Sequence, residues 1–357
     1  MARDGGARYH IGMSVDVPPV TDTRVAERAA VDAETFAREI APAYAPVVLR
    51  GQIADWPAVA AGRRGARALA EYVAGFAGGK PLEVLLGPPE IAGRFFYRDD
   101  MSGFNFTRQH VPLGALMVQL LRLAEEDVAD PPAIYANAAA AAEHLPGWAE
   151  ANRLGLPATG AAPRVWIGNA VRVATHYDVP ANLAAVVAGR RRFTLFPPEQ
   201  VANLYVGPLD RTLAGPPVSM VDPDEPDLDR YPRFAEALRH AQVADLGPGD
   251  AIFIPAIWWH HVRAFDRLNL LVNYWWGYDT AATPFTAMVH ALMAVRDLPL
   301  AEKQAWRAWF DHFIFNADAD DAGDHLPEAM RGVLGAPSRE RTERIRAYLL
   351  GSLSSRG

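Results

Sequence analysis

The centre of the chain alternates apolar and polar positions with the two-residue period of a β-strand. Before residue 176, the apolar members of this pattern are Val165, Ile167, Val171 and Val173. Two short apolar runs follow at residues 183–188 and 193–196, and Gly189 separates them. Because successive side chains of a strand point to opposite faces, this alternation predicts short strands joined by tight turns. We therefore predict a small β-barrel around the centre of the chain.

Apolar residues on either side of this centre recur with the period of an α-helix. Before the centre, helices are predicted at residues 32–41, 69–76 and 113–121. Asp32 is a suitable cap for the first of them. Short strands are expected at 46–50 and 133–137, and a helical tail at 283–293, 306–313 and 339–350. The pattern predicts a mainly β fold with flanking helices.

Three regions follow from this reading. Residues 1–30 have little periodicity and are expected to be a loosely ordered lead-in, and residues 31–280 form the β domain with its N-terminal helices. Residues 281–357 form a C-terminal helical bundle, whose aromatic stripes can pack on the barrel or on a second subunit. The acidic run at 222–229 is expected to be a solvated loop.

Composition narrows the function classes. The 357 residues are 50% hydrophobic, which is enough for a large core, and the net charge is −7 without a run of basic residues. Nucleic-acid binding is therefore not favoured. The absence of cysteine excludes disulfides, thiolate zinc sites and cysteine nucleophiles. No signal core or long apolar stretch is present, so we expect a cytoplasmic protein without a membrane segment.

Candidate chemistry begins with His176 and Asp178, which share one face of a strand if the segment is extended. A metal would need a third ligand, and the aromatic strand that ends in His260 and His261 can supply one. Two histidines and one carboxylate on one side of an ion form the facial triad of non-haem iron(II) oxygenases. Sequence alone leaves the choice between His260 and His261 open, because strand register decides which one faces inward. The plain alternative for His176 and Asp178 is a hydrogen-bonded histidine and a turn carboxylate.

The order of several motifs resembles the JmjC/cupin-like family of iron(II) and 2-oxoglutarate dioxygenases, and in particular its asparaginyl hydroxylases. The matching runs are HYD…GRRRFTLFPPEQ (176–200), VDPDEPDLDRYPRF (221–234), GPGDAIFIPAIWWHHV (247–262) and VNYWW (272–276). The resemblance implies a double-stranded β-helix, or jelly-roll, core. It also implies iron(II) held by His176, Asp178 and His261, with His260 on the opposite face.

The same resemblance implies a site for the co-substrate 2-oxoglutarate. Arg191 matches a family lysine that binds the far carboxylate, and an arginine can do so with two hydrogen bonds. The other matching positions are Tyr135, Asn182, Asn273 and Trp275. As alternatives, Arg191 could be a surface residue of a hairpin, Asn182 a turn cap and Trp275 a core residue. The sequence departs from the asparaginyl hydroxylases at Val173 and Ala184, where Thr and Phe are expected.

The implied activity is hydroxylation of a protein side chain, or of a peptide-like or small molecule, with succinate and carbon dioxide as co-products. Lysine demethylation is a weaker variant. The resemblance also implies a homodimer formed through the C-terminal helices. Two alternatives from other classes are a cupin-like protein that binds a metal or ligand without oxygen chemistry, and a metal-dependent isomerase on the same barrel.

Overall fold

The computed structural model describes residues 20–126, 128–156, 160–277 and 283–354. The chain divides into two compact units, Met1–Tyr278 and Asp279–Gly357. The first unit contains all the strands of the described residues, arranged in two sheets. The second unit is helical.

The strands of the larger sheet follow one another from edge to edge as β1 (Ala26–Ala29), β2 (Val47–Arg50), β12 (Ala251–Ile254), β9 (Ala181–Ala188), β14 (Asn269–Trp276), β7 (Arg164–Gly168), β6 (Ala133–Ala140), β3 (Leu82–Gly87) and β5 (Thr107–Val111). Those of the smaller sheet are β11 (Gln242–Leu246), β10 (Arg191–Phe196), β13 (Trp259–Ala264), β8 (Arg172–Tyr177) and β4 (Arg94–Phe95). From β7 to β10 consecutive strands alternate between the two sheets, and β12 to β14 do the same. This connectivity is the predicted jelly-roll core.

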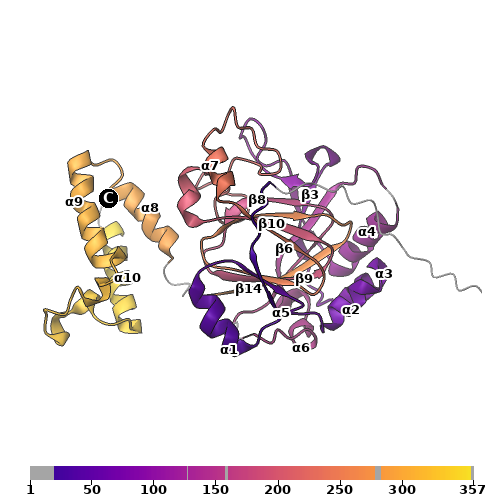
Figure 1. The fold of residues 1–357 in the computed structure, drawn as a ribbon, viewed down its shortest axis with the longest axis horizontal. Coiled ribbons are helices and arrows are strands. Elements are labelled where there is room, and N and C mark those ends of the chain that lie inside the picture. Colours follow the sequence, from indigo (N-terminus) through magenta and orange to yellow (C-terminus); the bar gives the residue numbers. More distant parts are fainter. Residues whose placement is uncertain (1–19, 127, 157–159, 278–282, 355–357) are drawn as a thin grey trace, which may run out of the picture. The chain divides into compact units, whose positions relative to one another are not determined.

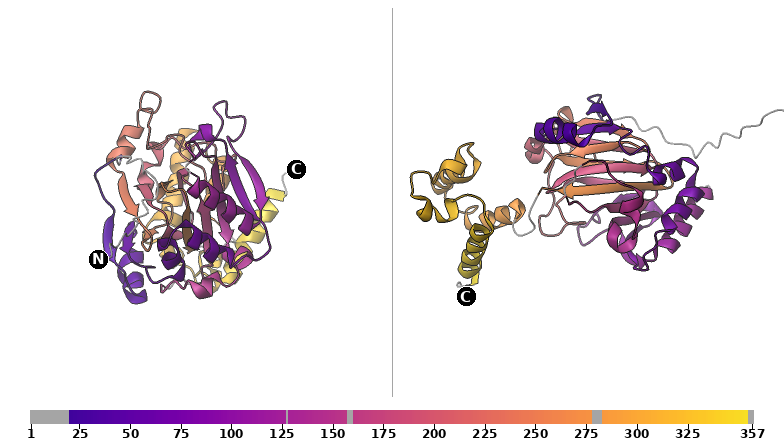
Figure 2. Two further views of the ribbon diagram at one scale, coloured as in Figure 1. Left: turned by 90° about the vertical axis from the view of Figure 1, so that its right-hand side faces the viewer. Right: turned by 90° about the horizontal axis from the view of Figure 1, so that it is seen from below.

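Strand β9 shows why the centre of the chain is so apolar. Ala184 and Val186 pack between the two sheets, whereas Leu183, Ala185 and Val187 pack on the other face of the larger sheet. Both faces of the strand are buried, so apolar residues occupy almost every position. Figure 2 shows how the larger sheet brings distant segments side by side, with β9 between β12 and β14.

Helices cover the outer face of the larger sheet. The helices of the first unit are α1 (Ala33–Thr35), α2 (Pro57–Arg63), α3 (Ala66–Ala74), α4 (Leu113–Glu125), α5 (Ala141–His144), α6 (Trp148–Ala151) and α7 (Phe234–Arg239), with short π or 3₁₀ turns at Phe36–Ile40, Ala41–Ala43, Pro89–Ile91 and Pro198–Ala202. Of these, α7 packs instead on Phe196 and Trp259 of the smaller sheet. Figure 1 shows α2, α3 and α4 grouped along one side of the strands. Their apolar faces, with Leu69 and Leu116 fully buried or nearly so, join the cluster that also contains Leu183.

The start of the domain is ordered earlier than residue 31. Val25 is buried, β1 pairs in parallel with β2, and Arg24 bridges to Val243. Residues 1–19 of the predicted lead-in lie outside the described residues. The predicted cap is present, since the side chain of Asp32 accepts a hydrogen bond from the backbone N–H of Thr35.

The second unit contains α8 (Pro284–Ala294), α9 (Leu300–Phe310) and α10 (Arg339–Ser354), with short turns at Asp311–Phe315, Ala319–Asp321, Glu328–Met330 and Gly332–Leu334. None of the three α-helices has a buried residue. Large apolar side chains such as Met293, Trp309 and Phe315 are more than half exposed. Among the described residues, no helix combines the length and the apolar character needed to cross a bilayer.

Candidate functional site

His176 and His260 lie opposite each other on two neighbouring strands of the smaller sheet. The antiparallel ladder of β8 and β13 pairs the two residues, and their ring centroids are 4.3 Å apart. Asp178 completes the group, with its Oδ2 atom 3.7 Å from His260 Nε2. Potential ligand atoms of the three side chains all lie within 4.8 Å of one another. The structure therefore assembles two imidazoles and one carboxylate around a common point.

The prediction that His261 joins this group is wrong, because His260 occupies the place. His261 pairs across the ladder with Thr194 of β10, and its side chain reaches Asp224 on the other face of the sheet. The ladder of β8 and β13 also contains a bulge between His260 and Val262. A shift of one residue reverses the face of every side chain, so register alone decides between adjacent histidines.

Backbone carbonyls orient both histidines of the group. His176 Nδ1 lies 2.9 Å from the carbonyl oxygen of Ala174, and His260 Nδ1 lies 3.1 Å from that of Trp258. A carbonyl oxygen can only accept, so each Nδ1 carries the hydrogen and each Nε2 presents a lone pair. Burial, followed by repulsion from His176, lowers the pKa of His260 to about 4. His260 is therefore neutral near pH 7, as a metal ligand must be.

A hydrogen-bonded chain fixes the carboxylate. Asp178 Oδ2 accepts from Asn182 Nδ2 at 2.9 Å and from Trp275 Nε1 at 3.0 Å. Asn273 Nδ2 donates in turn to Asn182 Oδ1 at 2.8 Å. These contacts fix the carboxylate beside His260 Nε2. Asn182, Asn273 and Trp275, which were predicted for the co-substrate, thus contribute first to holding the carboxylate.

Arg191 is a buried cation without an acidic partner among the described residues. It is 1% exposed, and its Nε and Nη2 atoms have no hydrogen-bond partner. Burial lowers its pKa, and interaction with the phenol of Tyr135 opposes this effect. Its neighbours behave differently, since Arg190 pairs with Asp266 and Arg192 with Asp245. An unpaired buried guanidinium is costly unless an anion joins it.

One cavity connects these features. Its lining includes all the predicted site residues except His261, namely Tyr135, His176, Asp178, Asn182, Arg191, Asn273 and Trp275. It also includes Trp166 and Val173. The alternation of β7 had assigned Val165 and Ile167 to the core, so Trp166 was not singled out. The sequence signal that could have identified Trp166 is its position between Val165 and Ile167. Because both faces of β7 are covered, a residue between two core positions faces the space between the two sheets.

His261 belongs to an ion-pair cluster behind the sheet. Asp222 and Asp224, predicted to lie in a solvated loop, have side chains only 7% and 4% exposed. The expectation is wrong at these two positions because arginines neutralise them: Arg94 and Arg172 contact Asp222, and Arg263 donates to Asp224 at 2.7 Å. Although His261 and the two aspartates are close enough to hold a cation, three guanidinium groups surround them. We interpret the cluster as a set of ion pairs that attaches the loop at residues 222–229 to β13.

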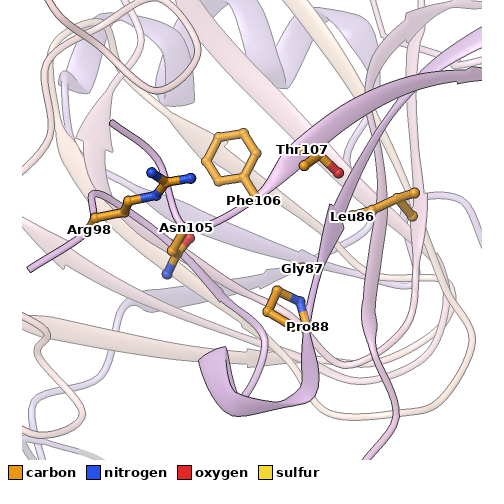
Figure 3. A pocket seen from close by; sticks show the side chains of 7 residues that line it. All are labelled: Leu86, Gly87, Pro88, Arg98, Asn105, Phe106 and Thr107. Carbon is orange, nitrogen blue, oxygen red and sulfur yellow. The ribbon is translucent and has the colours of Figure 1, made fainter. Parts of the chain in front are cut away.

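A second cavity, of about 340 Å³, lies at the end of β3, and Figure 3 shows the side chains that line it. Its lining is Leu86, Gly87, Pro88, Arg98, Asn105, Phe106 and Thr107. None of these side chains is a histidine or a carboxylate. The cavity therefore offers no imidazole or carboxylate for a metal or for acid–base chemistry, in contrast to the cavity between the sheets.

The site can be compared with known proteins. A family model described as a cupin-like domain matches residues 33–281. The chain is 39% identical over 112 residues to lysine-specific demethylase JMJ31 of Arabidopsis thaliana, covering 31% of this chain and 20% of that protein. It is 41% identical over 102 residues to tRNA wybutosine-synthesizing protein 5 of Danio rerio, covering 29% and 28%. It is 28% identical over 245 residues to lysine-specific demethylase 8 of Xenopus tropicalis, covering 65% and 48%. The chain thus spans at most about half the length of these relatives.

Proposed function

Because the chain belongs to the cupin-like family, we propose that it is an iron(II)- and 2-oxoglutarate-dependent oxygenase. The observation that carries the proposal is the content of one cavity. Two histidines and a carboxylate converge in it, and it also contains a buried arginine with unpartnered donors. Such a pairing of sites suits a ligand with a chelating group at one end and an anion at the other. 2-Oxoglutarate is a ligand of this kind.

His176, Asp178 and His260 fit a divalent iron ion. Each offers a free ligand atom, and the second nitrogen of each imidazole is held by a carbonyl. Two histidines and one carboxylate leave half of an octahedral coordination sphere open. When bound, iron(II) supplies the oxygen chemistry that couples decarboxylation of 2-oxoglutarate to hydroxylation of a substrate.

Arg191 is the proposed anchor of the far carboxylate. A fork of two N–H groups matches a carboxylate, and the charge persists at any working pH. The Nε and Nη2 atoms of Arg191 are the unpartnered ones, and they form one such fork. Binding the anion would neutralise the buried charge, so the same contact would stabilise the complex.

The other residues of the site orient Asp178 and shield the cavity from water. Asn182 and Trp275 keep Asp178 oriented, while Trp166, Phe193 and Leu271 give the cavity an apolar wall that excludes water. None of these residues needs to act as a nucleophile or a general base.

A protein side chain is the first proposal for the substrate, and a small molecule is the second. The names of the relatives refer to lysine demethylases and to tRNA wybutosine synthesis, so they point to different substrates. We further propose that the exposed apolar side chains of α8 to α10 mediate a homodimer.

Succinate release tests the proposed activity. Wild-type protein with iron(II) and 2-oxoglutarate should release succinate, slowly without substrate, and His176→Ala should abolish the release. If the wild type binds 2-oxoglutarate but forms no succinate with any candidate substrate, the chain is a binding protein. If it needs neither 2-oxoglutarate nor oxygen to transform a substrate, it is an isomerase.

A further inference from the structure

A continuous aromatic wall runs along the cavity from Arg191 to Asp178. Tyr135, whose phenol interacts with Arg191, stacks on Trp166 with ring centroids 5.7 Å apart and an interplanar angle of 29°. Trp166 in turn meets the edge of Trp275 at 6.0 Å and 88°. Trp275 donates to Asp178. Trp166 therefore occupies the middle of the wall, between the anion-binding end and the metal-binding end.

The indole N–H of Trp166 has no partner. Its Nε1 atom is buried from solvent and makes no hydrogen bond, although the ring lines the cavity. A buried N–H without an acceptor costs about 1 to 3 kcal/mol, so such a group usually serves a purpose. The other tryptophan of the wall is different, because Trp275 Nε1 already donates to Asp178. Of these two tryptophans, only Trp166 has a donor left for a ligand.

We infer that Trp166 donates a hydrogen bond from Nε1 to the far carboxylate of the co-substrate and thereby selects a dicarboxylate. The inference rests on the proposed function, since it names a further binding residue for the same ligand. A carboxylate has two oxygens and about four acceptor positions. The free Nε and Nη2 groups of Arg191 can fill two of them. We assign a third to the unpartnered indole N–H of Trp166, which lines the same cavity.

Among the described residues that line this cavity, the phenol of Tyr135 beside Arg191 is a second possible donor, whereas the other nearby polar groups are less suited. Val173 lines the cavity but carries no polar atom. Thr175 is fully buried with an unpartnered hydroxyl, yet it is not part of the lining. The free atom of Asn273 is its Oδ1 acceptor, because its Nδ2 donates to Asn182. An acceptor repels a carboxylate, so Trp166 and Tyr135 are the groups suited to assist Arg191, and Trp166 is the one whose donor has no partner.

Binding of two ligands can distinguish a hydrogen bond from Trp166 from simple packing by its ring. 2-Oxoglutarate and 2-oxopentanoate share the chelating end and the chain length, and they differ in whether the far carbon is a carboxylate or a methyl group. Affinity for each is measured by calorimetry on the full chain loaded with manganese(II), which avoids turnover. Trp166→Phe should weaken 2-oxoglutarate binding about tenfold, the loss expected for one hydrogen bond to a charged group. Binding of 2-oxopentanoate should change by no more than about twofold.

Trp148→Phe is the matched control, because Trp148 is also buried with an unpartnered Nε1 but lies in the core outside this cavity. It should leave both affinities unchanged. A variant with benzothienylalanine at position 166 keeps the ring shape and removes only the donor, so it decides the matter if Trp166→Phe folds poorly. Equal weakening of both ligands, or no change in either, would overturn the role of Trp166 while leaving the proposed function standing. Failure of the wild type to bind 2-oxoglutarate would overturn both.

Discussion

His176 and His260 face each other on one rung of the β8–β13 ladder, with ring centroids 4.3 Å apart. Their closeness results from strand pairing and not from sequence proximity. The site thus depends on the register of β13 against β8, and the bulge that follows His260 helps to set that register. The adjacent His261 takes the opposite face for the same reason.

This relationship predicts opposite results for the two adjacent histidines. His260→Ala removes one of three ligands and should weaken binding of manganese(II) or iron(II) at least about 100-fold, since two ligands hold such an ion poorly. His261→Ala should leave metal affinity within a few-fold of wild type, because its side chain lies behind the sheet with Asp224. Calorimetric titration of both variants with manganese(II) measures the difference. Equal losses in the two variants would contradict the assignment.

The hydrogen bonds to Asp178 should also contribute to metal affinity. Trp275→Phe removes the indole donor to Asp178 Oδ2 and should lower affinity for manganese(II) about tenfold or more, as is usual for groups that orient a ligand. Trp276→Phe is the control, because Trp276 packs on Phe36 and Phe253 away from the cavity. If both variants bind the metal equally well, the orienting role of Trp275 is refuted.

Arg191 should carry a cost in stability and a benefit in binding. Arg191→Met keeps much of the volume and removes an unpaired buried charge, so the ligand-free protein should be at least as stable as wild type in urea unfolding. The same variant should bind 2-oxoglutarate at least about 100-fold more weakly. Arg190→Met, which removes a half-exposed partner of Asp266, should affect binding little. A strongly destabilised Arg191→Met protein would indicate a structural role instead.

The exposed helices predict self-association. Trp306 and Trp309 are 47% and 61% exposed and lie on α9 in the second unit. Placing a charge among such side chains opposes their burial, so Trp309→Glu should shift the protein to a monomer in light scattering. The control is Arg307→Glu on the same helix. A wild-type chain that remains monomeric at micromolar concentration would rule the homodimer out.

A small β-barrel could be predicted from the alternating and apolar runs at the centre of the chain, and the jelly-roll core from motifs that occur in a family order. Three features of the structure could not be predicted from the sequence. The choice of His260 needed the register, which depends on partners far along the chain. The burial of Asp222 and Asp224 needed Arg94, Arg172 and Arg263, which come from other strands. The strand β1 was missed because its four residues are all exposed.

Acid should destabilise the metal-free protein through its buried histidines. Burial lowers the pKa of His261 to about 4, from an ordinary value near 6.5. The unfolded chain then binds a proton more readily than the folded one, so stability is highest above about pH 6.5. It falls as the pH drops towards 4 and levels off below that value. At about 1.4 kcal/mol per pKa unit, the loss from His261 is on the order of a few kcal/mol.

Replacing the titrating group should remove its share of this loss. His261→Gln stays neutral at every pH, so the decline in melting temperature between pH 6.5 and pH 4.5 should be several degrees smaller than in wild type. The exposed His110 on β5 provides the control, and His110→Gln should follow the wild-type curve. Thermal unfolding in the presence of a chelator gives both curves. Parallel curves for wild type and His261→Gln would show that other groups, such as the Asp222 and Asp224 ion pairs, cause the acid sensitivity.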